Sequence, residues 1–145
     1  MKNKTKVRIF IIITIALAFT GFIYYYQTNI SIWGFNISKN ELKNVLIQTK
    51  DNNYLITNPK LVLELAQEVA KTKKLYKLEP SNFPPKEAPT KYLSLVIGSN
   101  SNMGGSFWDD SNSGLMLDSN GYYWSVSSGL IELMDKSLKE AQKLL

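Results

Sequence analysis

Residues 2–26 read KNKTKVRIFIIITIALAFTGFIYYY, and this stretch decides how the rest of the chain is arranged. Residues 9–26 are 18 positions without a charged side chain, and most of them are Ile, Phe, Leu or Ala. As a helix rising about 1.5 Å per residue they reach roughly 27 Å, close to the bilayer hydrocarbon thickness of about 30 Å. The sequence therefore predicts a transmembrane anchor over residues 9–26.

A cleaved secretory signal peptide is the competing interpretation, because Ala16-Leu17-Ala18 fits the small-x-small pattern of a cleavage site. Cleavage there would leave the apolar residues 19–26 as the new N-terminus, whereas cleavage sites follow the apolar region rather than interrupt it. We therefore favour an uncleaved anchor. The three tyrosines 24–26 suit the headgroup layer at its far end.

Charge gives the orientation and excludes one class of partner. Of the 17 Lys and Arg residues, four lie in residues 1–8 without an acid among them, which predicts a cytoplasmic basic tip and an exterior location for everything after Gln27. The rest of the chain holds the remaining 13 basic residues and all 12 acidic ones. A nearly neutral exterior part lacks the electrostatic signature of a nucleic-acid binder, so we expect no nucleic-acid partner.

Residues 27–40 mix Ile, Trp and Phe with Asn and Ser, which indicates a first strand or a juxtamembrane segment in the membrane interface; we favour the strand. Residues 41–145 are then one extracytoplasmic domain of ordinary size. Alternating side chains over 45–57 predict a β-hairpin, and Asn58-Pro59 marks the start of a helix that should run to about Leu75.

The second half of the domain reads as a connector, three strands and a helix. Residues 79–90 hold four of the five prolines and predict an extended connector. Strands are expected at 92–97, at 106–108 resuming at 115–117, and at 122–126, followed by a helix that starts at Ser127 and runs to the C-terminus. The order β-β-α-β-β-β-α predicts an α+β fold, a small antiparallel sheet with two packing helices.

Missing residue types limit the chemistry. The chain has no His and no Cys, which removes Ser-His-Asp and Cys-His catalysis and the usual zinc ligands. We expect no cofactor, no metal and no enzymatic activity. The alternative is a carboxylate-dependent hydrolase of the cell envelope. Its candidate residues are Asp109, Asp110 and Asp118, which lie near one another in the sequence. We favour the interpretation that these aspartates are turn residues, because Asp beside Ser, Asn and Gly is typical of loops.

The densest candidate binding region is Met103 to Trp124, where aromatic side chains alternate with acids and amides. Its proposed binding residues are Trp108, Asp109, Asp110 and Tyr123. Aromatic residues on a strand also fill the core, and we favour this for about two of Trp108, Tyr122, Tyr123 and Trp124. Because side chains alternate along a strand, burial of Trp124 would leave Tyr123 exposed. A second charged feature is the cluster Lys71, Lys73, Lys74 and Lys77, which we place at the end of the first helix as partners of its dipole or as contacts for anionic lipid or polymer.

The anchor, the 45–57 hairpin, the Asn58-Pro59 helix, the Pro-rich loop and the segments Trp108-Asp109-Asp110 and Gly121-Tyr122-Tyr123 together resemble small uncharacterised extracytoplasmic proteins of Gram-positive bacteria. Those proteins are anchored by a membrane helix or a lipid, and the resemblance implies no activity. The sequence thus predicts a single-pass, membrane-anchored exterior domain that binds a protein or a component of the cell envelope.

Overall fold

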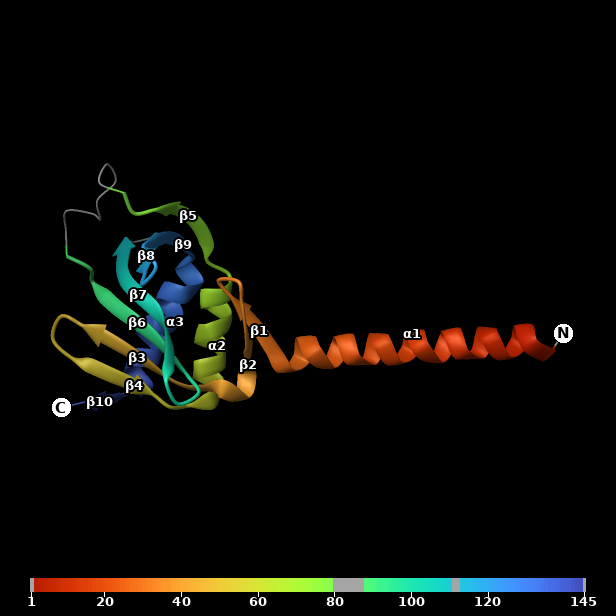
Figure 1. Cartoon of the computed structure of the whole chain (residues 1–145). Coiled ribbons are helices and arrows are strands. Elements are labelled where there is room, and N and C mark those ends of the chain that lie inside the picture. Colours follow the sequence, from red (N-terminus) through yellow and green to blue (C-terminus); the bar gives the residue numbers. More distant parts are fainter. Residues whose placement is uncertain (1, 80–87, 111–112, 145) are drawn as a thin grey trace.

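A computed structural model describes residues 2–79, 88–110 and 113–144. Helix α1 (Lys2–Thr28) projects away from a compact α+β domain (Figure 1). Its segment Val7–Thr28 has a mean hydropathy of 2.2 and is not covered by the domain. Length and composition fit a membrane span, and a signal sequence would meet the same two conditions. The predicted connector 79–90 falls largely outside the described residues.

The segment after α1 forms a small hairpin of its own. Strand β1 (Asn29–Ile32) pairs antiparallel with β2 (Phe35–Ser38). The two linking residues, Trp33 and Gly34, have φ angles of 53° and 87°, as a tight type I′ turn requires. Ile32 and Ile37 are buried in the core, so this hairpin belongs to the domain, as the strand interpretation expected. The short 3₁₀ helix η1 (Lys39–Glu41) follows.

Eight strands form one antiparallel sheet in the order β10-β4-β3-β6-β7-β8-β9-β5. Their bounds are β3 Leu42–Thr49, β4 Asn53–Ile56, β5 Lys73–Lys77, β6 Lys91–Ile97, β7 Ser101–Asp110, β8 Ser113–Asp118, β9 Tyr122–Val126 and β10 Gln142–Leu144. The predicted hairpin is β3–β4, and the predicted strands at 92–97 and 122–126 are β6 and β9.

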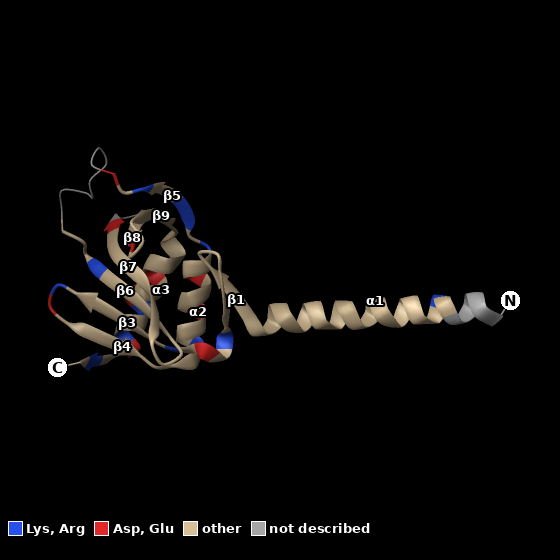
Figure 2. Cartoon of the chain, in the orientation of Figure 1, with Lys and Arg blue, Asp and Glu red and all other residues tan. Residues whose placement is uncertain are grey.

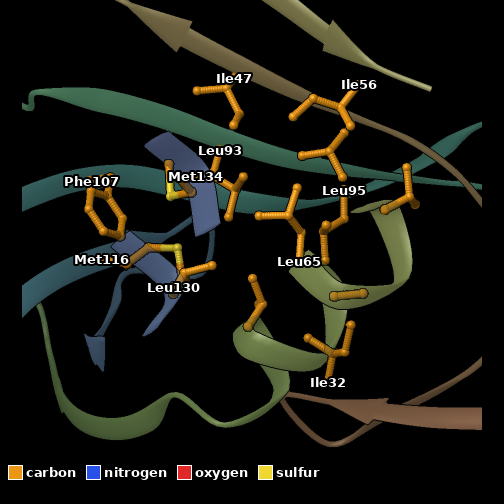
Figure 3. Packing of buried hydrophobic residues seen from close by; sticks show 14 of the residues in the cluster. Ile32, Ile47, Ile56, Leu65, Leu93, Leu95, Phe107, Met116, Leu130 and Met134 are labelled. Atoms are coloured by element: carbon orange, nitrogen blue, oxygen red, sulfur yellow. The ribbon is translucent and has the colours of Figure 1, made fainter. Parts of the chain in front are cut away.

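Helices α2 (Pro59–Ala70) and α3 (Ser128–Glu140) cover one face of this sheet. Each begins at the predicted cap: Asn58 accepts from the Lys60 amide, and Ser127 accepts from the Leu130 amide. Alternate strand residues such as Ile47, Leu93 and Leu95 meet Leu65 of α2 and Met134 of α3 in a continuous apolar core (Figure 3). The α+β fold with an antiparallel sheet and two packing helices is confirmed.

The first domain helix ends at Ala70, five residues earlier than the sequence indicated. Thr72 turns the chain, since its hydroxyl donates to the Val69 carbonyl, and residues 73–77 then pair with β9 as strand β5. Lys and Leu are good helix formers, but pairing with the sheet edge overrides that preference. Lys73, Lys74 and Lys77 therefore lie on an edge strand and not at the helix end. Lys71 is the C-cap residue of α2, where a cation can complement the helix dipole as predicted.

Two further boundaries differ from the prediction. The stretch expected as one interrupted strand is two paired strands, β7 and β8, and the last helix ends at Glu140 because β10 pairs with β4. Strand β7 starts at Ser101 and passes through Gly104 and Gly105. A Cβ on Gly104 would lie 1.8 Å from the Leu93 carbonyl oxygen, and one on Gly105 would lie 2.0 Å from that of Leu117. Only glycine permits such close strand approach here.

Candidate functional site

Of the binding residues proposed from the sequence, the three whose side chains the structure describes do not share one face of the sheet. Trp108 and Asp109 are neighbours on β7 and therefore point to opposite faces of the sheet. By register, Trp108 lies opposite Leu115 and Tyr123 opposite Leu117, which places both aromatic residues on the face away from the helices. Asp109 is on the helix-covered face with Phe107. The Asp110 side chain lies outside the described set.

The expectation that Tyr123 faces solvent is wrong. Tyr123 is 1% exposed and Trp124 is 8% exposed, so both faces of β9 are covered. The reason is strand β5, which the sequence analysis missed: it makes β9 an interior strand, and Tyr76 places its ring 5.0 Å from the Tyr123 ring. Burial raises the pKa of the Tyr123 phenol, and its hydroxyl has no hydrogen-bond partner in the described structure.

Asp109 takes part in an ion-pair network that joins three elements. Lys91 on β6 contacts the Asp109 carboxylate and also lies 3.1 Å from Asp135 Oδ1 on α3. Burial alone would raise the pKa of Asp109, but hydrogen bonds from Lys91 and Thr90 outweigh it and lower the pKa. Burial likewise opposes the charge of Lys91, and its two acidic partners still raise its pKa. This geometry indicates that the network stabilises the packing of β6, β7 and α3.

Asp118 is also committed to the fold. It is 6% exposed and accepts hydrogen bonds from the Trp124 indole at 2.8 Å, the Asn120 amide at 2.8 Å and the Tyr122 amide at 2.9 Å. Asp118 lies opposite Gly105, four residues along β7 from Asp109, which separates the two backbones by about 14 Å. Asp109 and Asp118 therefore do not form the closely spaced pair that glycosidic hydrolysis needs.

A groove of about 390 Å³ lies between the β1–β2 hairpin and one end of the large sheet. Its lining comes from the hairpin, from η1, from the adjoining ends of β6 and β7, and from the β8–β9 turn. The apolar residues are Trp33, Phe35, Ile37, Ile97 and Met103, and the polar ones are Asn36, Glu41, Ser101, Asn102, Ser119 and Asn120. Such a mixture of apolar walls and a few polar groups is typical of a binding site.

Trp33 is the fixed centre of this groove. Its positive φ is unusual for a bulky residue, and two contacts hold the side chain in place. The indole stacks on Trp124 with 5.0 Å between ring centres and 23° between planes, and its Nε1 donates to the Thr72 hydroxyl at 2.9 Å. Asp118 in turn fixes Trp124. The groove wall is therefore preorganised.

The groove has an exposed aromatic residue at its edge and lies close to the end of α1. Phe35 at its rim is 59% exposed, an unusual position for a phenylalanine that has a core beside it. Asn36 lines the groove and also a neighbouring hollow of about 290 Å³, whose other residues include Tyr25 and Tyr26 at the end of α1. A ligand in the groove would consequently lie next to the end of the apolar helix.

This groove was not predicted because its residues come from segments that lie far apart in the sequence. One local signal was present: Trp33-Gly34 stands between alternating apolar residues, and a two-residue linker ending in glycine favours a hairpin turn. Comparison of the chain with known protein families, with characterised proteins and with solved structures gave no significant match. The function is therefore argued from geometry.

Proposed function

We propose that the chain is a single-pass membrane protein whose extracytoplasmic domain binds a segment of another protein in the groove beside Trp33. The anchor is α1, with the basic tip inside and the domain outside. The proposal keeps the non-enzymatic interpretation of the sequence. Asp109 and Asp118 are occupied in structural contacts, so these two residues give the hydrolase alternative no support.

The chemistry of the groove favours a peptide segment as its ligand. The indole and phenyl faces of Trp33 and Phe35 can take up an apolar side chain, and the amides of Asn102 and Asn120 can donate to and accept from a peptide backbone. Glu41 is the one ionisable group of the lining, so a neutral or basic segment fits better than an acidic one.

One observation carries the proposal: a strained, hydrogen-bonded and stacked Trp33 forms the wall of a groove whose rim holds the exposed Phe35. Aromatic anchors held rigidly at the centre of a contact surface supply much of the binding energy of protein interfaces. Folding alone does not require Phe35 to be exposed at this place.

Site-specific photo-crosslinking in cells tests the proposal. A benzophenone amino acid at Asn102, within the groove, should give a discrete adduct, and the same probe at Asn53, at the start of β4 and at the end of the sheet away from the groove, should not. A second substitution, Phe35→Ser, should remove the Asn102 adduct. Phe35 is largely exposed, so this change should leave the melting temperature within a few degrees.

Two results would overturn the proposed site. An Asn102 adduct that persists unchanged in the Phe35→Ser background would show that the groove is not the contact surface. Equal crosslinking from Asn53 and Asn102 would show contact without a preferred face.

A further inference from the structure

Strand β5, at one edge of the large sheet, is the most basic exposed element of the described domain. All five of its residues are exposed, and three of them are Lys73, Lys74 and Lys77. Lys74 Nζ lies 3.3 Å from the centre of the Tyr122 ring, and Lys77 Nζ lies 5.7 Å from the same centre. These cation–π contacts gather two ammonium groups over one aromatic ring at the edge of the sheet.

These lysines lie on the side of the domain from which α1 extends. Figure 2 shows the blue strand β5 at the margin of the domain above the point where α1 leaves it. Lys39 Nζ donates to the carbonyl of Gln27, in the last turn of α1, at 2.7 Å. The indole of Trp33 also reaches Thr72, the residue before β5, so the groove and the basic edge are neighbours.

Pairing of a second extended chain with β5 is disfavoured by the strand itself. Lysines along an edge strand and an irregular register are two means by which sheet edges avoid such pairing. Strand β5 has both, since its register to β9 shifts between Lys74 and Lys77. The exposed positive charge therefore fits a flat anionic surface better than it fits an added strand.

We propose that the β5 edge and Lys39 form a docking surface for the anionic phospholipid headgroups of the leaflet in which α1 ends. This inference rests on the proposed anchoring by α1. A lysine near an anionic bilayer is attracted only within about one Debye length, roughly 10 Å at moderate salt. Because α1 holds the domain at the bilayer, weak attractions suffice to orient it. Docking places the Trp33 groove beside the lipid surface.

Energy transfer in nanodiscs tests this orientation with the full chain. The protein has no cysteine, so a donor dye can be placed on a single Leu75→Cys, on β5, or on Asn53→Cys, at the start of β4. Acceptor-labelled discs are made of phosphatidylcholine alone or with about 30% phosphatidylglycerol, which supplies the surface potential. We expect transfer from position 75 to rise in the anionic discs while transfer from position 53 does not rise.

Charge-matched variants identify the lysines responsible. The triple variant Lys73→Gln, Lys74→Gln, Lys77→Gln should lose the lipid-dependent rise. Its control changes three exposed lysines elsewhere, Lys50→Gln, Lys60→Gln and Lys136→Gln, and should keep it. Raising the salt to about 1 M, where the Debye length is near 3 Å, should also abolish the rise.

The outcomes separate this inference from the proposal on which it rests. If α1 is not an anchor, the chain will separate from the discs at high salt. The docking surface is refuted if the chain stays in the discs but energy transfer from position 75 is the same in neutral and anionic discs. It is also refuted if both triple variants behave alike. The Asn102 crosslink tests the groove as a contact surface, and its outcome does not depend on either of these results.

Discussion

Tyr123 combines full burial with an unused hydrogen-bonding group. Its ring lies against Tyr76, on the face of the sheet opposite to Trp124, and its hydroxyl is unpartnered in the described structure. An unpaired hydroxyl in such a place lowers stability, while the ring contributes to packing. The two contributions can be separated by substitution.

We predict that Tyr123→Phe keeps or raises the free energy of unfolding, by up to about 1 kcal/mol, because it removes only the unpaired group. Tyr123→Ala should lower it by about 3 to 5 kcal/mol, because it leaves a cavity. Urea denaturation followed by tryptophan fluorescence measures both. A loss of more than about 1 kcal/mol in the phenylalanine variant would mean that the hydroxyl has a stabilising partner.

The Lys91 network should give the domain a dependence on pH. The pKa of Asp109 is lowered from 3.8, so its contribution to stability is present above pH 3.8 and is lost as the pH falls through the folded-state value. The pKa of Lys91 is raised from 10.5, so its contribution is present below pH 10.5 and is lost as the pH rises through its folded-state value. We expect stability to fall at both limits.

Lys91→Met tests the acid limit. The variant should lower the free energy of unfolding at neutral pH by about 2 kcal/mol, because it leaves Asp109 buried beside an apolar chain. It should also flatten the decline below pH 3.8, since the partner that lowers the pKa of Asp109 is gone. Lys50→Met, on an exposed turn, is the control. An unchanged acid profile in Lys91→Met would assign the decline to other carboxylates.

At the scale of elements, local signals predicted most of the sheet and failed where distant strands decide. The caps Asn58 and Ser127 and the alternation in β3, β6 and β9 are encoded within a few residues, and they were found. Strand β5 was taken as helix because its partner β9 lies some fifty positions away in sequence. The groove was not predicted for the same reason: the segments that line it are distant in sequence and meet only in the folded chain.

Strand β7 depends on glycine for its close neighbours. Gly104→Ala should lower the free energy of unfolding by more than about 3 kcal/mol, because the new Cβ would meet a backbone carbonyl that cannot move alone. Gly129→Ala is the matched control: its Cβ would meet the flexible Glu68 carboxylate at 3.2 Å, and alanine favours the helix by about 1 kcal/mol. Thermal melts of the two variants should move in opposite directions. Similar melts would show that β7 adjusts to a side chain.

At the scale of the whole molecule, the chain separates into an exposed apolar helix and a domain that closes its core without it. The buried cluster begins at Ile32, and the apolar side chains of α1 from Val7 to Tyr26 stay exposed. An exposed surface of this size is unfavourable in water and favourable in a bilayer. The basic tip before it is the basis for the proposed orientation, with residues 1–8 inside.

The absence of native cysteine makes this topology directly measurable. A membrane-impermeant maleimide applied to intact cells should label Asn53→Cys and should label Asn3→Cys only after permeabilisation, because residues 1–8 are expected inside. The reverse pattern would invert the orientation. The mature mass completes the test, since an uncleaved chain retains 16.5 kDa. A membrane-released species that lacks residues 1–18 would instead identify Ala16-Leu17-Ala18 as a cleavage site and α1 as a signal sequence.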